Sequence, residues 1–423
     1  MTTSEPIRLL HFADLHVGIE RYGHIDPATG LNGRAMDFLR RLSDLVDFAI
    51  AKKVDLVIFA GDAYKNRDPN STYRREFAWR IKELADHGIP VVLIPGNHDL
   101  PAVAARASSI EVFATLAVPN VVVLEQFELI TLTAARGQAV QVAAAPYPLT
   151  SELLSQEEYR GISLEDLDGM VSAKMVESIQ ALAARAREQA QTPAILVGHF
   201  SVSTAELGSE RGLMVGRDVT VPRSVLADPT WDYVALGHIH KHQDLNAGAH
   251  PPVVYSGSVE RVDFGEEKEP KGWVLAEVGR GRTSYQFITQ HQRQARRFVT
   301  IDCDCRQAAD PTDEVLKAIA RREVADAIVR VRVELRPDQE AGLKERTIRA
   351  ALAEAYEVAA ISREVEGAVR SRWGAINVEA LTPMQQLELF FRSSNVPETQ
   401  VKGLLADADA IIREVDAALV AAS

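Results

Sequence analysis

Short apolar runs alternate with longer amphipathic segments from residue 7 to about residue 278, and this alternation limits the folds open to the chain. The runs that read as buried strands are 8–12, 55–60, 90–94, 121–125, 139–145, 194–197, 233–236, 253–255 and 273–278. Apolar residues in 35–50 and 167–175 recur with the spacing of an amphipathic helix. Early strands alternate with helices, whereas later strands follow one another closely. The pattern predicts an α/β domain with a mixed sheet or a two-sheet sandwich, with helices outside.

The composition excludes several classes of protein. The chain has 423 residues, of which 46% are hydrophobic and 25% charged, as in globular proteins of two to three domains. No apolar run approaches the roughly 18 residues that a spanning helix needs. Residues 1–6 lack the pattern of a signal sequence, so we expect no membrane span and a cytoplasmic, nucleoid-associated protein.

Charge and cysteine content narrow the chemistry further. The net charge of −12 argues against coating nucleic acid by overall charge, but it leaves room for a local basic surface or for bound cations. Cys303 and Cys305 are the only cysteines. They are too few for a disulfide framework or a four-thiolate zinc site, so we expect them to be packing residues.

Polar residues with metal-binding side chains follow five of the predicted strands. They are Asp14 and His16, then Asp62, then Asn97 with His98 and Asp99, then His199, and finally His238 and His240. Ligands collect at the carboxyl ends of the strands in layered α/β folds, so residues far apart in the chain can meet there. Any one of these histidines alone would more often be a structural residue. The recurrence of the pattern at five strand ends predicts a shared metal site.

The donor types restrict the ion. Carboxylate, imidazole and amide donors without a thiolate fit manganese, iron or zinc better than copper(I) or calcium. Seven donors are too many for one ion, but two ions that share one bridging carboxylate would use them all. We expect two Mn²⁺ ions, with Mg²⁺, Fe²⁺ or Zn²⁺ as alternatives. The remaining histidines are expected to be structural, and they are His11, His24, His87, His242, His250 and His291.

In this order, the motifs Asp-x-His, Gly-Asp, Gly-Asn-His-Asp, Gly-His and Gly-His-x-His resemble those of the calcineurin-like metallophosphoesterases over residues 7–278. The resemblance implies that one metal is held by Asp14, His16, Asp62 and His240. It implies that a second metal is held by Asp62, Asn97, His199 and His238, with Asp62 bridging. His98 would then contact the phosphate and assist the leaving oxygen, while Asp99 would orient His98.

Two further segments, YSGSVERVDFGEE at 255–267 and KGWV at 271–274, closely resemble the SbcD nuclease subunits of double-strand-break repair. The resemblance implies a nuclease domain at 1–280, a DNA-contacting α+β capping domain at 281–366, a linker at 367–381 and a helix-loop-helix at 382–423 that binds an SbcC-like coiled-coil ATPase. From the sequence we expect the second unit to run strand 298–303, helix 315–322, strand 327–335 and helix 339–356. Capped helix starts at 382–385 and 395–398 agree with the last element.

A local basic segment suggests where DNA would bind. Residues 64–82 carry six basic side chains against Asp68 and Glu76, and the residues that we expect to contact DNA are Lys65, Arg67, Arg74 and Arg75. The alternative is a solvated helix face, because Tyr73, Phe77, Ile81 and Leu84 recur with helical spacing. In the family, this helix and 35–50 form a dimer interface, so we expect a homodimer.

One residue departs from the family pattern. Archaeal members carry a second histidine three residues after the bridging aspartate, and the resemblance links that histidine to exonuclease action. Lys65 stands at this position here. Lysine binds phosphate but does not shuttle protons near neutral pH unless its pKa is strongly lowered. The resemblance therefore supports phosphodiester cleavage more directly than processive exonuclease action.

Three functions are open at this point. The leading hypothesis is a two-metal DNA nuclease, an exonuclease or endonuclease that acts with a coiled-coil ATPase in DNA repair and recombination. The second is a DNA-end tethering module with little catalysis, and the third is a stand-alone nucleotide phosphodiesterase. All seven predicted metal ligands are present, which speaks against a tethering module.

Overall fold

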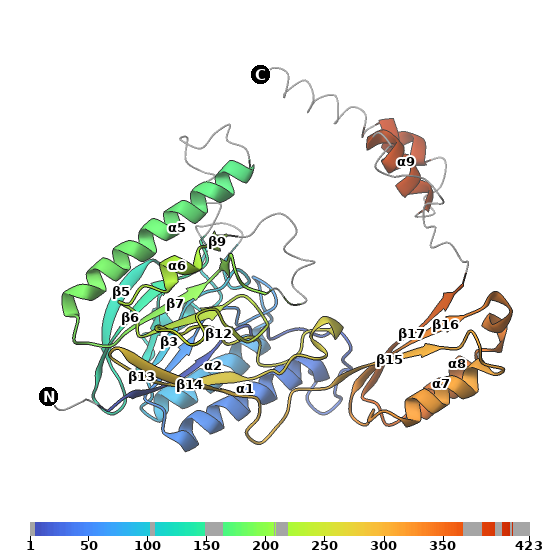
Figure 1. Ribbon diagram of the computed structural model, residues 1–423, viewed down its shortest axis with the longest axis horizontal. Helices are drawn as coiled ribbons and strands as arrows, with labels where there is room; N and C mark the ends of the chain where they lie inside the picture. The colour runs from blue at the N-terminus through green and yellow to red at the C-terminus, as the bar shows by residue number, and fades with distance from the viewer. Residues whose placement is uncertain are drawn as a thin grey trace. The chain divides into compact units, whose positions relative to one another are not determined.

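The computed structural model describes residues 5–101, 106–148, 164–206, 208, 219–366, 383–393, 400–406 and 408 (Figure 1). By their internal contacts the residues form two compact units. Unit 1 comprises the chain up to Thr300 with Glu323–Arg330 and Leu352–Ala360, and unit 2 comprises Ile301–Arg322, Val331–Ala351 and the described residues from Ile361 onward.

Unit 1 contains two six-stranded sheets. The first has the order β14-β13-β1-β2-β3-β4 and the second the order β11-β12-β10-β7-β6-β5. The strands of the first sheet are β1 (Ile7–Phe12), β2 (Leu56–Phe59), β3 (Val91–Leu93), β4 (Val121–Val123), β13 (Trp273–Gly279) and β14 (Arg282–Ile288). Those of the second are β5 (Glu128–Thr133), β6 (Ala139–Ala145), β7 (Ala194–His199), β10 (Tyr233–Gly237), β11 (Gln243–Asp244) and β12 (Val253–Tyr255). Both sheets are mixed, and the predicted two-sheet sandwich is confirmed.

Successive side chains of a strand point to opposite faces of the sheet, and this explains the layers. In β1, Leu10 and Phe12 face α1 (Gly33–Lys52) and α2 (Ser71–Asp86), whereas Ile7 and Leu9 face the second sheet. The outer face of the second sheet packs against α5 (Leu164–Ala186). The unit is therefore a four-layer sandwich with helices on both outer faces (Figure 1).

Four neighbouring strands run parallel in each sheet, so their carboxyl ends lie at one edge, where the site forms. In the first sheet β1, β2, β3 and β4 are parallel, and in the second β12, β10, β7 and β6 are parallel. The antiparallel strands β13 and β14 in the first sheet and β5 and β11 in the second complete the sheets. Strands β5 and β14 are absent from the sequence prediction because they are edge strands that mix apolar and polar residues, most of them half-buried or exposed.

A third sheet has the order β15-β16-β17, formed by β15 (Phe298–Asp304), β16 (Ile328–Leu335) and β17 (Glu357–Val365). Backbone hydrogen bonds from Ile328 to Arg297 and from Cys305 to Glu334 run in the sense of parallel strands. The predicted strand 298–303 and the strand 327–335 agree with β15 and β16.

The predicted helices of this part need correction. The helix expected at 315–322 is α7 (Pro311–Ala320), which begins four residues earlier because Asp310 caps the backbone N–H groups of Thr312 and Asp313. The helix expected at 339–356 is wrong over most of its length. A 3-10 helix at Pro337–Gly342 is followed by the short α8 (Glu345–Ala351) and then by β17.

The C-terminal predictions are only partly within the described residues. Helix α9 (Pro383–Ser393) follows the predicted capped start, and residues 400–406 and 408 are helical. The predicted linker 367–381, the second start at 395–398 and the end of the apolar stripe lie outside the described residues. Among the residues that the structure describes, no helix is both long and apolar enough to cross a membrane. Cys303 and Cys305 are buried, as expected of packing residues.

Candidate metal centre

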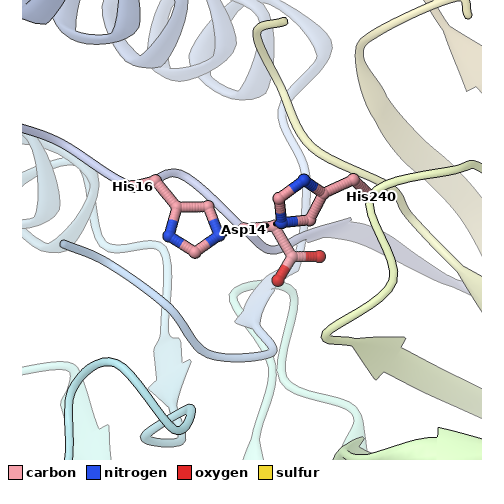
Figure 2. A group of neighbouring side chains, drawn as sticks. All are labelled: Asp14, His16 and His240. Carbon is pink, nitrogen blue, oxygen red and sulfur yellow. Dashed lines mark hydrogen bonds between the residues drawn. The ribbon is translucent and has the colours of Figure 1, made fainter. Parts of the chain in front are cut away.

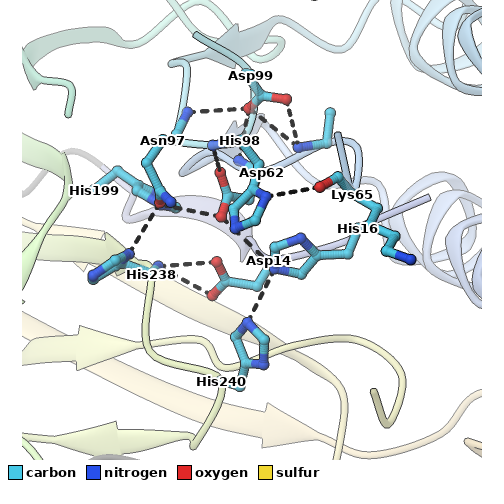
Figure 3. Close-up of polar contacts among 12 residues, drawn as sticks. Asp14, His16, Asp62, Lys65, Asn97, His98, Asp99, His199, His238 and His240 are labelled. Carbon is cyan, nitrogen blue, oxygen red and sulfur yellow. Dashed lines mark hydrogen bonds and ion pairs between the residues drawn. The ribbon is translucent and has the colours of Figure 1, made fainter. Parts of the chain in front are cut away.

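Five strand ends from both sheets meet at one place, and they bring together all seven predicted metal-binding side chains (Figure 3). Asp14 and His16 follow β1, Asp62 follows β2 and Asn97 follows β3, all in the first sheet. From the second sheet, His199 ends β7, and the pair His238 and His240 follows β10. The predicted convergence of residues far apart in the chain is therefore present.

The backbone around these residues is unusual. Asp14, His16, Asp62 and His238 have positive φ angles of 51°, 46°, 63° and 96°. Residues other than glycine rarely adopt this left-handed conformation, which costs on the order of 1–3 kcal/mol each and is concentrated at functional sites. Four such residues in one cluster indicate that backbone strain is tolerated here because it directs these side chains toward one another.

Glycines before the ligands allow the strand ends to approach closely. A Cβ atom on Gly61 would lie 2.4 Å from Nδ1 of His199, and Gly61 has a φ of +95°. A Cβ atom on Gly96 would lie 2.2 Å from Oδ1 of Asp62. The glycines of the Gly-Asp and Gly-Asn-His-Asp motifs are thus required by packing against the neighbouring donors.

One group of donors consists of Asp14, His16 and His240, and Figure 2 shows these three side chains pointing toward one another. Their ligand atoms all lie within 4.8 Å of one another. The Nε2 atoms of His16 and His240 are 3.0 Å apart, and Nε2 of His16 lies 3.7 Å from Oδ2 of Asp62. His16 and Asp14 are buried. The spacing allows all of these atoms to face one cation.

A second group forms around His199 and Asn97. Ligand atoms of Asp14, Asp62 and His199 all lie within 4.8 Å of one another. Oδ1 of Asn97 lies 3.1 Å from Nε2 of His199. Oδ1 of Asn97 also lies 3.2 Å from Nδ1 of His238. The backbone N–H of His238 donates to Oδ1 of Asp14 at 2.9 Å, which ties the two groups together (Figure 3).

The hydrogen bonds of His199 test whether a cation fits. Nδ1 of His199 lies 2.7 Å from the carbonyl oxygen of Ala60, which can only accept, so Nδ1 carries a proton. Without a metal ion, a proton on Nε2 can bridge to the oxygens of Asn97 and Asp62; once that proton leaves, Nε2 presents a lone pair toward these oxygens, which are also acceptors. Converging lone pairs of this kind are stabilised by a positive charge between them. The residues present therefore fit a metal ion.

The electrostatics of the cluster lead to the same conclusion. Burial lowers the pKa of His199, but the nearby Asp62 carboxylate outweighs burial and raises that pKa to about 9. Burial raises the pKa of Asp62, yet His199 and its other imidazole neighbours hold the Asp62 pKa well below its usual value. Burial lowers the pKa of His16, which favours the neutral imidazole that binds metals. The cluster thus holds ionised Asp62 in a buried place that attracts positive charge.

His98 and Asp99 do not make the contact that we expected. Nδ1 of His98 lies 2.7 Å from the carbonyl oxygen of Lys65. The carboxylate of Asp99 instead accepts hydrogen bonds from the backbone N–H groups of Asp62, Ala63 and Gly96 and from the hydroxyl of Ser109. Asp99 therefore holds the loop that carries Asp62, and a backbone carbonyl orients His98.

His98 lies beside the metal-binding donors. Its ring is 5.0 Å from that of His16 in an edge-to-face contact, and its donor atoms fall in one group with those of His16 and Asp62. The backbone N–H of His98 donates to Oδ1 of Asp62 at 2.9 Å. The six histidines expected to be structural all lie within the described residues, and none of them joins a metal-binding group.

Sequence reasoning missed two residues behind His240. Oε1 of Glu266 lies 2.7 Å from Nδ1 of His240, and Lys271 contacts the other oxygen of Glu266 at 3.1 Å. Glu266 ends a short 3-10 helix (Phe264–Glu266) rather than a strand, so the strand-end pattern does not include it. The sequence feature that could have identified Glu266 is its place in the 255–267 segment that resembles SbcD.

The predicted basic surface is smaller than its charge count suggests. Helix α2 buries Tyr73, Phe77, Ile81 and Leu84, so the helical face expected as the alternative is present. Acidic neighbours pair with four of the six basic side chains, in the pairs Arg74–Asp68, Arg75–Glu76, Arg80–Glu76 and Lys82–Asp86. Lys65 and Arg67 are exposed, and the described residues show no ion pair for either.

Comparison with known proteins decides the family. The family model described as Calcineurin-like phosphoesterase matches residues 7–242, more than half of the chain. The chain belongs to the calcineurin-like phosphoesterase family. Members of the family bind two metal ions, and the His and Asp groups described above supply donors for them. The protein is therefore a metallophosphoesterase, a hydrolase by family.

Similar curated proteins include nuclease subunits and a repair protein. The chain is 28% identical to the SbcD subunit of the nuclease SbcCD from Rhodobacter capsulatus, over 76% of this chain and 77% of that protein. It is 28% identical to the SbcD subunit of the nuclease SbcCD from Bacillus subtilis, over 65% and 67%. It is 24% identical to the DNA double-strand break repair protein Mre11 of Halobacterium salinarum, over 77% and 70%.

Proposed function

We propose that this phosphoesterase is a metal-dependent DNA nuclease subunit that hydrolyses phosphodiester bonds and acts with a coiled-coil ATPase in DNA repair and recombination. The observation that carries the proposal is the meeting of seven oxygen and nitrogen donors at one point of a chain similar to SbcD subunits over most of its length. We propose two Mn²⁺ ions as the resident metals, because carboxylate, amide and imidazole donors suit this ion.

The donors divide between two positions. Asp14, His16 and His240 would hold one ion, and Asn97, His199 and His238 the other, with Asp62 shared. The 3.7 Å and 3.4 Å separations of the Asp62 carboxylate from Nε2 of His16 and of His199 support this division. When bound, two such ions activate a water molecule and neutralise the charge that develops on the phosphoryl oxygens.

His98 would move the proton. Its Nδ1–H is held by the Lys65 carbonyl at 2.7 Å, which leaves Nε2 for the substrate. Protonated His98 would donate the Nε2 proton to the leaving oxygen as the P–O bond breaks, while water adds to phosphorus. The products are a phosphate monoester and a free hydroxyl. Asp99 would keep the Asp62 loop in position through its backbone hydrogen bonds.

Other parts of the chain have proposed partners. We propose the nuclease domain at 1–280, the DNA-contacting capping domain at 281–366, and a surface within 382–423 for an SbcC-like ATPase, on the strength of the similarity to SbcD subunits. The exposure of Trp79, which is 57% exposed on α2 under the guanidinium of Arg75, supports a homodimer through this helix.

Lys65 and Arg67 are the basic residues whose charge is best placed to meet DNA. We expect K65A/R67A to weaken binding to duplex DNA and to reduce the slope of log K against log salt by about 2, since each phosphate contact contributes about 1. Alanine at 65 keeps the backbone carbonyl that orients His98. Fluorescence anisotropy over a range of salt concentrations measures both quantities.

The control for this variant is K174A/R187A, which changes the net charge equally at two exposed residues that are paired with Glu177 and Asp228. It should bind DNA as the wild type does. Equal salt slopes for K65A/R67A and the wild type would show that Lys65 and Arg67 do not contact DNA. Arg74 and Arg75 would then be the remaining proposed DNA contacts.

End-labelled duplex and hairpin DNA incubated with Mn²⁺, with and without the ATPase, tests the proposed function. We expect Mn²⁺-dependent fragments that chelation abolishes. Binding of DNA ends without any cleavage, even with the ATPase, would favour a tethering module. Hydrolysis of a cyclic nucleotide with no cleavage of DNA and no binding of an ATPase by 382–423 would favour a stand-alone phosphodiesterase.

A further inference from the structure

His240 is backed by a carboxylate on the side opposite to the metal-binding group. Its Nε2 faces His16 at 3.0 Å, whereas its Nδ1 lies 2.7 Å from Oε1 of Glu266. The Glu266 side chain is fully buried and that of His240 is 12% exposed. Glu266 comes from a short 3-10 helix that is remote in sequence from β10.

Glu266 is itself fixed by a buried lysine. Nζ of Lys271 lies 3.1 Å from Oε2 of Glu266, and both side chains are fully buried. The same Nζ donates to the carbonyl oxygen of His240 at 3.0 Å. The backbone N–H of Val262 donates to Oε2 of Glu266 at 2.7 Å. Both carboxylate oxygens therefore have partners, and Lys271 holds the backbone of His240 while Glu266 holds its ring.

The other imidazoles of the site are held differently. Nδ1 of His199 faces the carbonyl oxygen of Ala60, and Nδ1 of His98 faces that of Lys65. Both are uncharged backbone acceptors. Among the hydrogen bonds described for the site histidines, a carboxylate partner behind the ring belongs to His240. A carboxylate thus lies behind the ring of His240, whereas backbone carbonyl oxygens lie behind the rings of His199 and His98.

We propose that Glu266, held by Lys271, is a positioning residue that fixes the ring orientation and the Nδ1–H tautomer of His240 for metal binding. The proposal rests on the proposed function, in which His240 is a metal ligand. An ionised carboxylate only accepts hydrogen bonds, so Nδ1 carries the proton and Nε2 presents its lone pair to the ion. Residues that support a ligand from behind in this way typically contribute about 10–100-fold to metal affinity.

Lys271 explains why such a carboxylate is tolerated in the interior. A buried charge without a partner is strongly destabilising, whereas an ion pair with complete hydrogen bonds is not. Removal of Glu266 alone would leave the ammonium group beside His240 without this partner, and we expect that variant to lose stability. Replacement of both residues by apolar side chains of similar volume avoids this, because such exchanges of buried ion pairs are often neutral or stabilising.

The test compares three variants in Mn²⁺ titrations of the whole protein, followed by electron paramagnetic resonance of the free ion. E266L/K271M removes the acceptor and both charges, and we expect one of the two ions to bind about 10–100-fold more weakly. E266Q/K271M keeps an amide oxygen that can accept from Nδ1, and it should bind that ion with intermediate affinity. E269Q changes the other carboxylate that contacts Lys271, at 2.9 Å, and should bind both ions as the wild type does.

A second readout is independent of metal and of activity. Metal-free protein with ¹⁵N-labelled histidine should show a hydrogen-bonded imidazole N–H resonance for His240 in the wild type and in E269Q. This resonance should be lost in E266L/K271M. A purely structural role would leave it unchanged once folding is equal, which circular dichroism establishes.

The outcomes separate the two proposals. Two ions bound with wild-type affinity by E266L/K271M would overturn the positioning role and leave the proposed function standing. An equal loss in E269Q would also overturn it, because the effect would then come from the local charge and not from the contact with His240. If the wild type itself did not bind two ions, the proposed function would fail and the positioning role with it.

Discussion

Replacement of Asp62 by asparagine is expected to weaken both metal positions at once and to slow phosphodiester cleavage by about 10³-fold or more. The Asp62 carboxylate lies near imidazoles of both groups, 3.7 Å from Nε2 of His16 and 3.4 Å from Nε2 of His199. Metal ions supply several kcal/mol of transition-state stabilisation, and about 1.36 kcal/mol corresponds to a factor of ten in rate. Mn²⁺ titration and the cleavage rate of labelled duplex DNA measure the two effects.

The matched control is D55N. Asp55 is also a fully buried carboxylate, but it precedes β2, at the opposite end from Asp62, and pairs with Arg136 at 2.6 Å. The loss of its charge costs stability without touching the metal centre, so Mn²⁺ binding should be kept. If D62N still bound two ions and cleaved DNA at the wild-type rate, Asp62 would not be the shared ligand.

The chemistry of the site was predictable because it is contained in short stretches next to strands. A strand end is recognisable from its apolar run, and parallel strands of one sheet end on one edge, so Asp14, Asp62 and Asn97 had to lie close together. Their meeting with His199 and His240 required a second sheet whose parallel strands end at the same place. The tight succession of the later strands indicated that sheet.

Contacts made by single hydrogen bonds were not predictable in the same way. The resemblance to the calcineurin-like metallophosphoesterases implied that Asp99 orients His98. The carboxylate instead turns to the backbone of the Asp62 loop, where buried N–H groups need acceptors. Glu266 was missed for a related reason, since the 3-10 helix that delivers it has no periodicity to read.

Charge counting also has a limit that the structure makes visible. The segment 64–82 is strongly basic as a sequence, yet most of its basic side chains pair with acidic neighbours on α2 or, in the case of Asp68, just before it. Asp86, the partner of Lys82, lies beyond the end of this segment. Net charge over a stretch is therefore a poor guide to the potential at a helix surface, where the spacing of the partners decides which charges remain unpaired.

His98 could serve as a metal ligand or as a proton donor, and the geometry allows an experiment to distinguish the two roles. Its ring stands in one donor group with His16 and Asp62, which suits a ligand, whereas its Nδ1 is bound to the Lys65 carbonyl, which suits a proton donor at Nε2. The backbone N–H of His98, and not its side chain, supports Asp62 at 2.9 Å. Truncation of the side chain therefore leaves this support for the shared carboxylate in place.

For this reason H98A is expected to lower the cleavage rate by about 10²–10⁴-fold, the usual contribution of a general acid, while both Mn²⁺ ions and DNA still bind. Single-turnover cleavage, Mn²⁺ titration and anisotropy measure the three properties on one preparation. H87A is the control, because His87 is exposed and its Nδ1 likewise faces a backbone carbonyl, that of Glu83 at 2.8 Å. Loss of one ion in H98A would make His98 a ligand, and an unchanged rate would exclude it from proton transfer.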